Sequence, residues 1–182
     1  MVSPDVKRMS ARELFAAARR ASKDAEFVVR RLERMRESEG VRGASLAPST
    51  SHSRADVNGT ARVDARMDYE VRARAQLDED LGLIDYARSV LYGAPGVGVS
   101  GLARLFGMLA ADLLCCYYLG WRYCTDPRPD LSLGSGLMTW AEAAEDVGVP
   151  ERSAYRKAQE ALDLVDMYTP EVVMGGRGEA ED

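Results

Sequence analysis

Seven apolar residues near the start of the chain recur at alternating steps of four and three, and this spacing constrains the fold more than any other feature. They are Leu14, Ala18, Ala21, Ala25, Val28, Leu32 and Met35. Such steps place all seven on one stripe of an α-helix, over the minimum length that favours a coiled coil. Ser10 and Glu13 have the spacing of a capping box, so the helix is predicted to begin there. The stripe is a candidate oligomerisation seam, although packing of the helix on its own domain would explain it equally well.

A second long helix is predicted from about Arg62 to Leu91. It is interrupted by Arg74 and Arg88, and its approximate apolar stripe consists of Val63, Met67, Val71, Leu77, Leu81, Ile84 and Leu91. The residues between the two helices, from about 40 to 60, are rich in Ser, Thr, Ala and Gly and are predicted to be a flexible linker. Residues 1–92 are therefore expected to form a helical hairpin or a coiled-coil arm.

Residues 93–170 are predicted to form a compact helical domain, which makes the whole protein all-α. An apolar helix is expected over Gly101–Leu119, with Gly107 as a break. The segment Asp126–Gly136 contains several prolines and glycines and is predicted to be a loop. The end of the chain, residues 171–182, is rich in glycine and acidic residues and is predicted to be a disordered tail.

The chain has three cysteines, Cys115, Cys116 and Cys124, and one histidine, His52 in the linker. Their spacing matches no zinc site, and a single linker histidine provides no Ser-His-Asp or Cys-His set. We therefore expect no metal, no cofactor and no enzymatic activity. The odd number of cysteines prevents complete pairing, and no secretory or membrane-spanning segment is recognisable, so we expect a cytoplasmic protein. The sequence assigns no role to the three cysteines.

The stretch 139–163 has the layout of a helix-turn-helix. Thr139 is placed to cap a short helix, Ala144 is small where two helices must cross, and Gly148 permits the turn. Pro150 then opens the second helix. The predicted inner face of that helix is formed by Ala154, Tyr155, Ala158, Ala161 and Leu162, and its outer side carries Arg152, Arg156 and Lys157.

The charge of the chain is distributed unevenly. Its net charge is −5, yet residues 1–60 carry 12 basic and 8 acidic groups, whereas residues 139–166 carry 3 basic and 7 acidic groups. Phosphate contacts provide most of the affinity in ordinary DNA binding, so this motif has few groups to make them. Asp163 and Asp166 can point away at the far end of the second helix. Glu151 lies at the end that usually meets base edges.

The segments Trp140–Ala144, Gly148–Arg156 and Ala161–Leu162 resemble sigma factor region 4. More closely, the chain resembles phage-encoded regulators of late and packaging genes, which share its plan of two long helices before a sigma-like helix-turn-helix. The resemblance implies binding to double-stranded DNA, with RNA polymerase as a partner. Carried over by position, it implies that the turn is held by Trp140, Ala144, Gly148 and Val149. By the same resemblance, Arg152, Ser153, Arg156 and Lys157 would face DNA. Glu151 and Tyr155 complete the set of six candidate DNA contacts.

These observations favour a sequence-specific DNA-binding transcription regulator of phage or prophage type. Pairing of subunits through the amino-terminal seam would double the phosphate contacts and offset the weak charge of one copy. Two alternatives remain open. One is an oligomer for DNA packaging or assembly, similar to a small terminase. The other is a helical protein-interaction module without a DNA role, whose acidic carboxyl-terminal end binds a basic partner.

Overall fold

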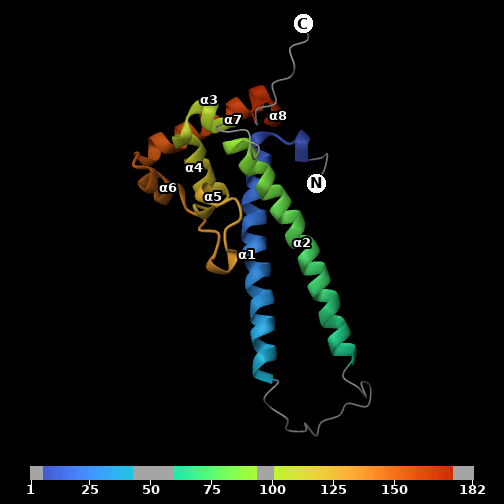
Figure 1. The fold of residues 1–182 in the computed structure, drawn as a ribbon. Helices are drawn as coiled ribbons and strands as arrows, with labels where there is room; N and C mark the ends of the chain where they lie inside the picture. The colour runs from blue at the N-terminus through green and yellow to red at the C-terminus, as the bar shows by residue number, and fades with distance from the viewer. Residues whose placement is uncertain (1–5, 43–59, 94–100, 174–182) are drawn as a thin grey trace.

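A computed structural model describes residues 6–42, 60–93 and 101–173. Two long antiparallel helices, α1 (Ala11–Arg42) and α2 (Thr60–Tyr92), form a hairpin, and the remaining helices gather as a head beside one end of it (Figure 1). The other end of the hairpin extends away from the head. Most of the predicted linker, residues 43–59, lies outside the described residues.

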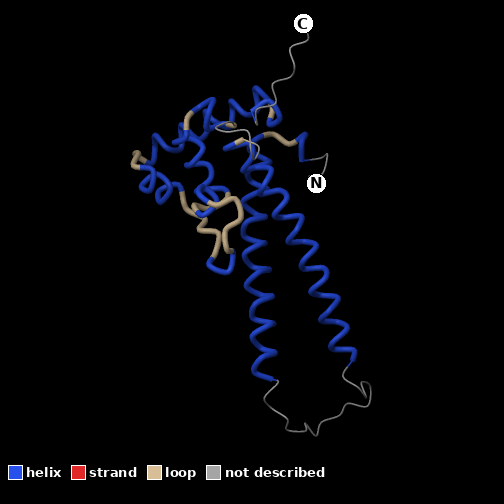
Figure 2. Tube along the Cα trace, in the orientation of Figure 1, coloured by secondary structure: helices blue, strands red, loops and turns tan. Residues whose placement is uncertain are grey.

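The described part of the chain contains helices and no strand, which confirms the all-α prediction (Figure 2). A short 3₁₀ helix, η1 (Val6–Arg8), precedes α1. The head consists of α3 (Leu102–Phe106), α4 (Met108–Tyr118), α5 (Arg122–Thr125), η2 (Leu131–Leu133), α6 (Trp140–Val147), α7 (Glu151–Tyr168) and α8 (Pro170–Val173). The predicted break at Gly107 separates α3 from α4. Helix α8 occupies the first residues of the segment that was predicted to be a disordered tail, and residues 174–182 lie outside the described residues.

The amino-terminal seam packs within its own chain. Leu14, Ala18, Ala21 and Ala25 are buried in a core that also contains residues of α2, α4 and α7. The last three members, Val28, Leu32 and Met35, are half-buried nearer the free end of the hairpin. The sequence left open whether the seam packs on its own domain or on a second subunit. The structure shows that its first four members pack on their own domain. A second subunit would find no exposed surface on these four side chains.

The predicted stripe of α2 is wrong at Met67 and Val71, and the side chain of Val63 lies outside what the structure describes. Met67 and Val71 are 62% and 66% exposed, whereas Ala73 is buried. The stripe is correct where α2 meets the head, because Ile84 and Leu91 are fully buried. The head supplies the second layer that buries these residues. Toward the other end of the hairpin, α1 and α2 lie beyond the head and bury fewer large side chains between them.

Candidate nucleic-acid interface

The turn between α6 and α7 is determined by local sequence. Thr139 and Glu142 form a reciprocal capping box at the start of α6, as the sequence predicts for Thr139. The hydrogen bond from the Thr139 backbone N–H to the Glu142 carboxylate lowers the pKa of Glu142. Gly148 ends α6 in the left-handed conformation, with φ 75°, a region that glycine enters without strain. Val149 then donates its backbone N–H to the carbonyl of Ala144 at 2.9 Å, which closes the turn before Pro150.

Helices α4, α6 and α7 form one packed unit around small side chains. Ala143, Ala144 and Ala154 are buried together with Leu113 and Cys116 of α4, and Val149 packs against this cluster. Small residues at these positions let the three helices approach closely. In this unit α4 packs against both α6 and α7, which the tight turn joins, and the first turns of α7 face solvent.

The loop between α5 and α6 folds onto α1. The backbone N–H and the hydroxyl of Ser135 both donate to Glu26 of α1, each at 3.0 Å. The last part of the loop is held against the end of α4 and the start of α5, since the backbone N–H of Trp121 donates to the Gly136 carbonyl and that of Met138 donates to the Cys116 carbonyl, each at 3.1 Å. The loop is therefore attached to the hairpin and leaves the first turns of α7 exposed.

The six candidate DNA contacts lie in the first two turns of α7. Glu151, Arg152, Tyr155 and Arg156 are exposed, and Ser153 and Lys157 are half-buried. The prediction that Tyr155 faces inward is wrong: its side chain is 51% exposed. The other members of the predicted inner face are buried, namely Ala154, Ala158, Ala161 and Leu162. Tyr155 follows Ala154 directly in the sequence and is therefore rotated away from it around the helix axis, which places it at the edge of the buried stripe.

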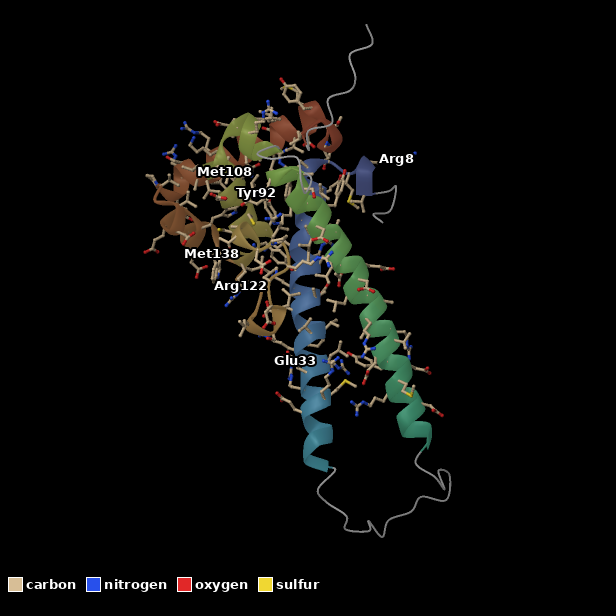
Figure 3. All side chains as sticks on the ribbon, viewed as in Figure 1. Arg8, Glu33, Tyr92, Met108, Arg122 and Met138 are labelled. Atoms are coloured by element: carbon tan, nitrogen blue, oxygen red, sulfur yellow. The ribbon has the colours of Figure 1, made fainter. Side chains whose placement is uncertain are left out.

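A row of aromatic side chains connects the exposed face of α7 to α1. The Tyr155 ring meets Trp140 edge-on at 5.9 Å between centroids, and Trp140 stacks on Tyr117 at 3.8 Å. The guanidinium of Arg19 on α1 lies over the opposite end of the row, 4.0 Å from the Tyr117 centroid. Arg19 also donates to the carbonyl of Met138, which Figure 3 labels in the head. These contacts connect the start of α7 to α1.

The bordering part of α1 is basic, and this part of the surface was not predicted from the sequence. Arg12, Arg19, Arg20 and Lys23 recur at helical spacing on the side opposite the buried seam, and all but the half-buried Arg19 are exposed. Arg12 reaches α7 directly, with hydrogen bonds to Gln159 and an ion pair to Asp163 at 2.7 Å. These basic residues could be recognised in the sequence as the polar face of the helix, opposite the seam. Only the fold places Arg12 of that face beside α7.

Three of the predicted framework residues, Ala144, Gly148 and Val149, lie at the turn, whereas Trp140 is at the other end of α6. Trp140 is half-buried in the aromatic row, Ala144 is 1% exposed in the packed unit, and Gly148 and Val149 form the turn. No described helix has both the length and the apolar character that crossing a bilayer requires. Comparisons with protein-family models, with curated proteins and with solved structures find no match for this chain.

Proposed function

We propose that this protein is a sequence-specific DNA-binding transcription regulator, in which the first turns of α7 enter the major groove. The observation that carries the proposal is the packed unit of α4, α6 and α7, with its tight turn at Gly148 and its exposed Arg152 and Arg156. This is the geometry by which a recognition helix reaches base edges. Arginine is also the side chain that most often reads guanine in that groove.

The basic face of α1 supports the proposal because it supplies the phosphate contacts that α7 lacks. Arg20 and Lys23 are exposed on α1, and the aromatic row joins their helix to Tyr155 of α7. Each phosphate neutralised by a basic side chain contributes about 0.9 to the slope of log affinity against log salt concentration. In this proposal α7 reads sequence, while α1 provides affinity that does not depend on sequence.

The test is a fluorescence anisotropy titration of the full chain with DNA from its own flanking regions and with an unrelated duplex, at several salt concentrations. Three double variants are compared. One removes charge from α7 (Arg152→Ala with Arg156→Ala), and one removes charge from α1 (Arg20→Ala with Lys23→Ala). The matched control removes two exposed arginines from α2, at Arg72 and Arg74.

We expect the α7 variant to lose most of the preference for its own DNA. We expect the α1 variant to bind both duplexes more weakly and to lower the salt slope by about 2. The α2 control should behave as the unchanged protein does. Absence of saturable binding at low salt, with the protein folded by circular dichroism, would overturn the proposal. It would favour the protein-interaction module instead.

Oligomerisation belongs to the same proposal but needs a surface other than the buried seam. The hairpin exposes Phe27 on α1 and Met67 and Val71 on α2, each more than half exposed. These side chains are the ones we propose for pairing of subunits. The double substitution Met67→Ser with Val71→Ser should convert a dimer into a monomer, and light scattering measures this change in mass. A stable ring of many subunits would favour the packaging alternative. RNA polymerase is a proposed partner on the sigma-like resemblance alone.

A further inference from the structure

Three thiols converge where α4 meets α5. The Sγ atoms of Cys116 and Cys124 are 3.6 Å apart, and the Cys115 Sγ lies 3.7 Å from the Gly120 carbonyl oxygen. A disulfide requires about 2.05 Å between sulfur atoms, so a movement of roughly 1.5 Å would join Cys116 to Cys124. In the described part of the chain, no group of three or more His, Cys, Asp or Glu side chains is placed to hold a metal ion.

The two members of the close pair differ in access to solvent. Cys116 is 2% exposed in the packed unit, whereas Cys124 is partly exposed on α5. An oxidant from solvent therefore reaches Cys124 first. Cys116 lies within reach behind it and can act as the second thiol.

The surroundings favour the thiolate of Cys124. Hydrogen bonds from Cys115 and from Cys116, with the positive charge of Arg88, lower the pKa of Cys124. The Arg88 guanidinium is held beside α5 by its hydrogen bond to the Tyr123 carbonyl at 2.9 Å. A thiolate with partial exposure and a neighbouring thiol is the arrangement found in oxidisable cysteines.

Two acidic groups face the same cluster. Asp112 accepts a hydrogen bond from Tyr92, which Figure 3 labels between α2 and the head, at 2.7 Å. The hydrogen bond to Cys124 and burial raise the pKa of Cys116, and the negative charges of Asp146 and Asp112 add to that rise. The cluster therefore favours ionisation of Cys124 over ionisation of Cys116, which is the order that a stepwise reaction requires.

We propose that Cys116 and Cys124 form an oxidisable dithiol that a hydroperoxide converts to an intrachain disulfide. The Cys124 thiolate attacks one peroxide oxygen, the O–O bond breaks, and the departing oxygen takes up a proton and leaves as water or an alcohol. Cys124 is then a sulfenic acid. The Cys116 sulfur attacks the Cys124 sulfur, the S–O bond breaks, and the oxygen leaves as water with the Cys116 proton. Two thiols lose two electrons, and the peroxide gains them.

The bond would lie directly beneath the candidate recognition helix. Cys116 packs against Ala143, Ala144 and Ala154, and its backbone carbonyl accepts the N–H of Met138 just before α6. Cys124 packs against the same cluster, so the disulfide would form beside the small residues that hold α6 and α7 to α4. The dithiol itself does not depend on the DNA-binding proposal, because its formation is measured on the protein alone.

The test treats the reduced full chain with dilute hydrogen peroxide under native conditions and then blocks the remaining thiols with an alkylating reagent. Mass spectrometry should find a chain lighter by two hydrogen atoms, with Cys116 joined to Cys124 in the peptide map and Cys115 alkylated after unfolding. Cys115→Ser should leave this disulfide intact, whereas Cys124→Ser should abolish it. Circular dichroism of each variant verifies folding, and the map of the unchanged protein provides the test if a variant unfolds.

Three outcomes would overturn the proposal. The first is recovery of all three thiols after treatment. The second is a disulfide that contains Cys115. The third is accumulation of sulfinic acid on Cys124 without any disulfide, which would mean that Cys116 does not reach the oxidised sulfur faster than a second peroxide does.

Discussion

Gly120 is the point where the end of α4 meets the loop that leads to α6, and substitution with alanine should be strongly destabilising. Its φ is 113°, a conformation that L side chains rarely adopt. A Cβ atom at this position would run into the Ser135 carbonyl oxygen and lie 2.7 Å from the Ser135 carbonyl carbon. These are backbone atoms, and they cannot rotate away as the end of a side chain could.

Ser135 is also unable to retreat at low cost. It is fully buried, and its N–H and hydroxyl are both bonded to Glu26. The unfavourable backbone conformation costs about 1–2 kcal/mol, and forcing a methyl group into a filled site costs about 1–3 kcal/mol more. We therefore expect Gly120→Ala to lower the free energy of unfolding by about 3 kcal/mol. For a chain of this size, the corresponding fall in Tm is roughly 6–12 °C.

The matched control is Gly107→Ala. Gly107 has a similar φ of 101°, but a Cβ atom there would meet nothing within 4 Å. The control should therefore lose only the conformational part, about 1–2 kcal/mol. Urea unfolding followed by circular dichroism measures both variants. If Gly120→Ala costs no more than Gly107→Ala, the close approach of α4 to the loop does not limit stability and the reasoning is refuted.

Three further substitutions test separate contacts. Glu26→Ala removes the acceptor of the buried Ser135 N–H and should cost about 1–3 kcal/mol in urea unfolding, and Glu26→Gln, which keeps an acceptor, should cost less. Thr139→Ala removes the α6 cap and should cost about 1 kcal/mol, and Thr139→Ser as a control should retain most of it. Burial raises the pKa of Asp80, whose Oδ2 has no hydrogen-bond partner, so Asp80→Asn should stabilise the protein by about 1 kcal/mol at neutral pH. That gain should vanish as the pH falls through the raised pKa, where Asp80 itself becomes neutral; a gain that persists at acidic pH would contradict this assignment.

Features that depend on neighbouring residues in the sequence could be predicted. The cap at Thr139, the turn at Gly148 and the opening of α7 after Pro150 each involve a few consecutive residues, and the structure confirms them. The helical class follows equally from the spacing of apolar residues. These features use interactions within one or two helical turns, so periodicity and capping rules are sufficient to find them.

Features that depend on contacts across the fold could not be predicted. The seam at Leu14 and Ala18 has the same spacing whether its partner is another subunit or α2 of the same chain. Tyr155 belongs to the apolar pattern of α7, yet it lies at the edge of the stripe against Trp140 and is half exposed. The position of the loop depends on the approach of Gly120 to Ser135, which no local rule describes.

The acidic composition of the motif region has a structural explanation that composition alone did not provide. Asp163 forms an ion pair with Arg12, and Asp166 accepts the backbone N–H of Ala11, the first residue of α1. A carboxylate at a helix amino terminus is favoured by the helix dipole, so these acids position α1 against α7. They lie in the second half of α7, away from its exposed first turns. The net charge of the motif therefore overstates the free negative charge of α7, because Asp163 is paired with Arg12 of α1.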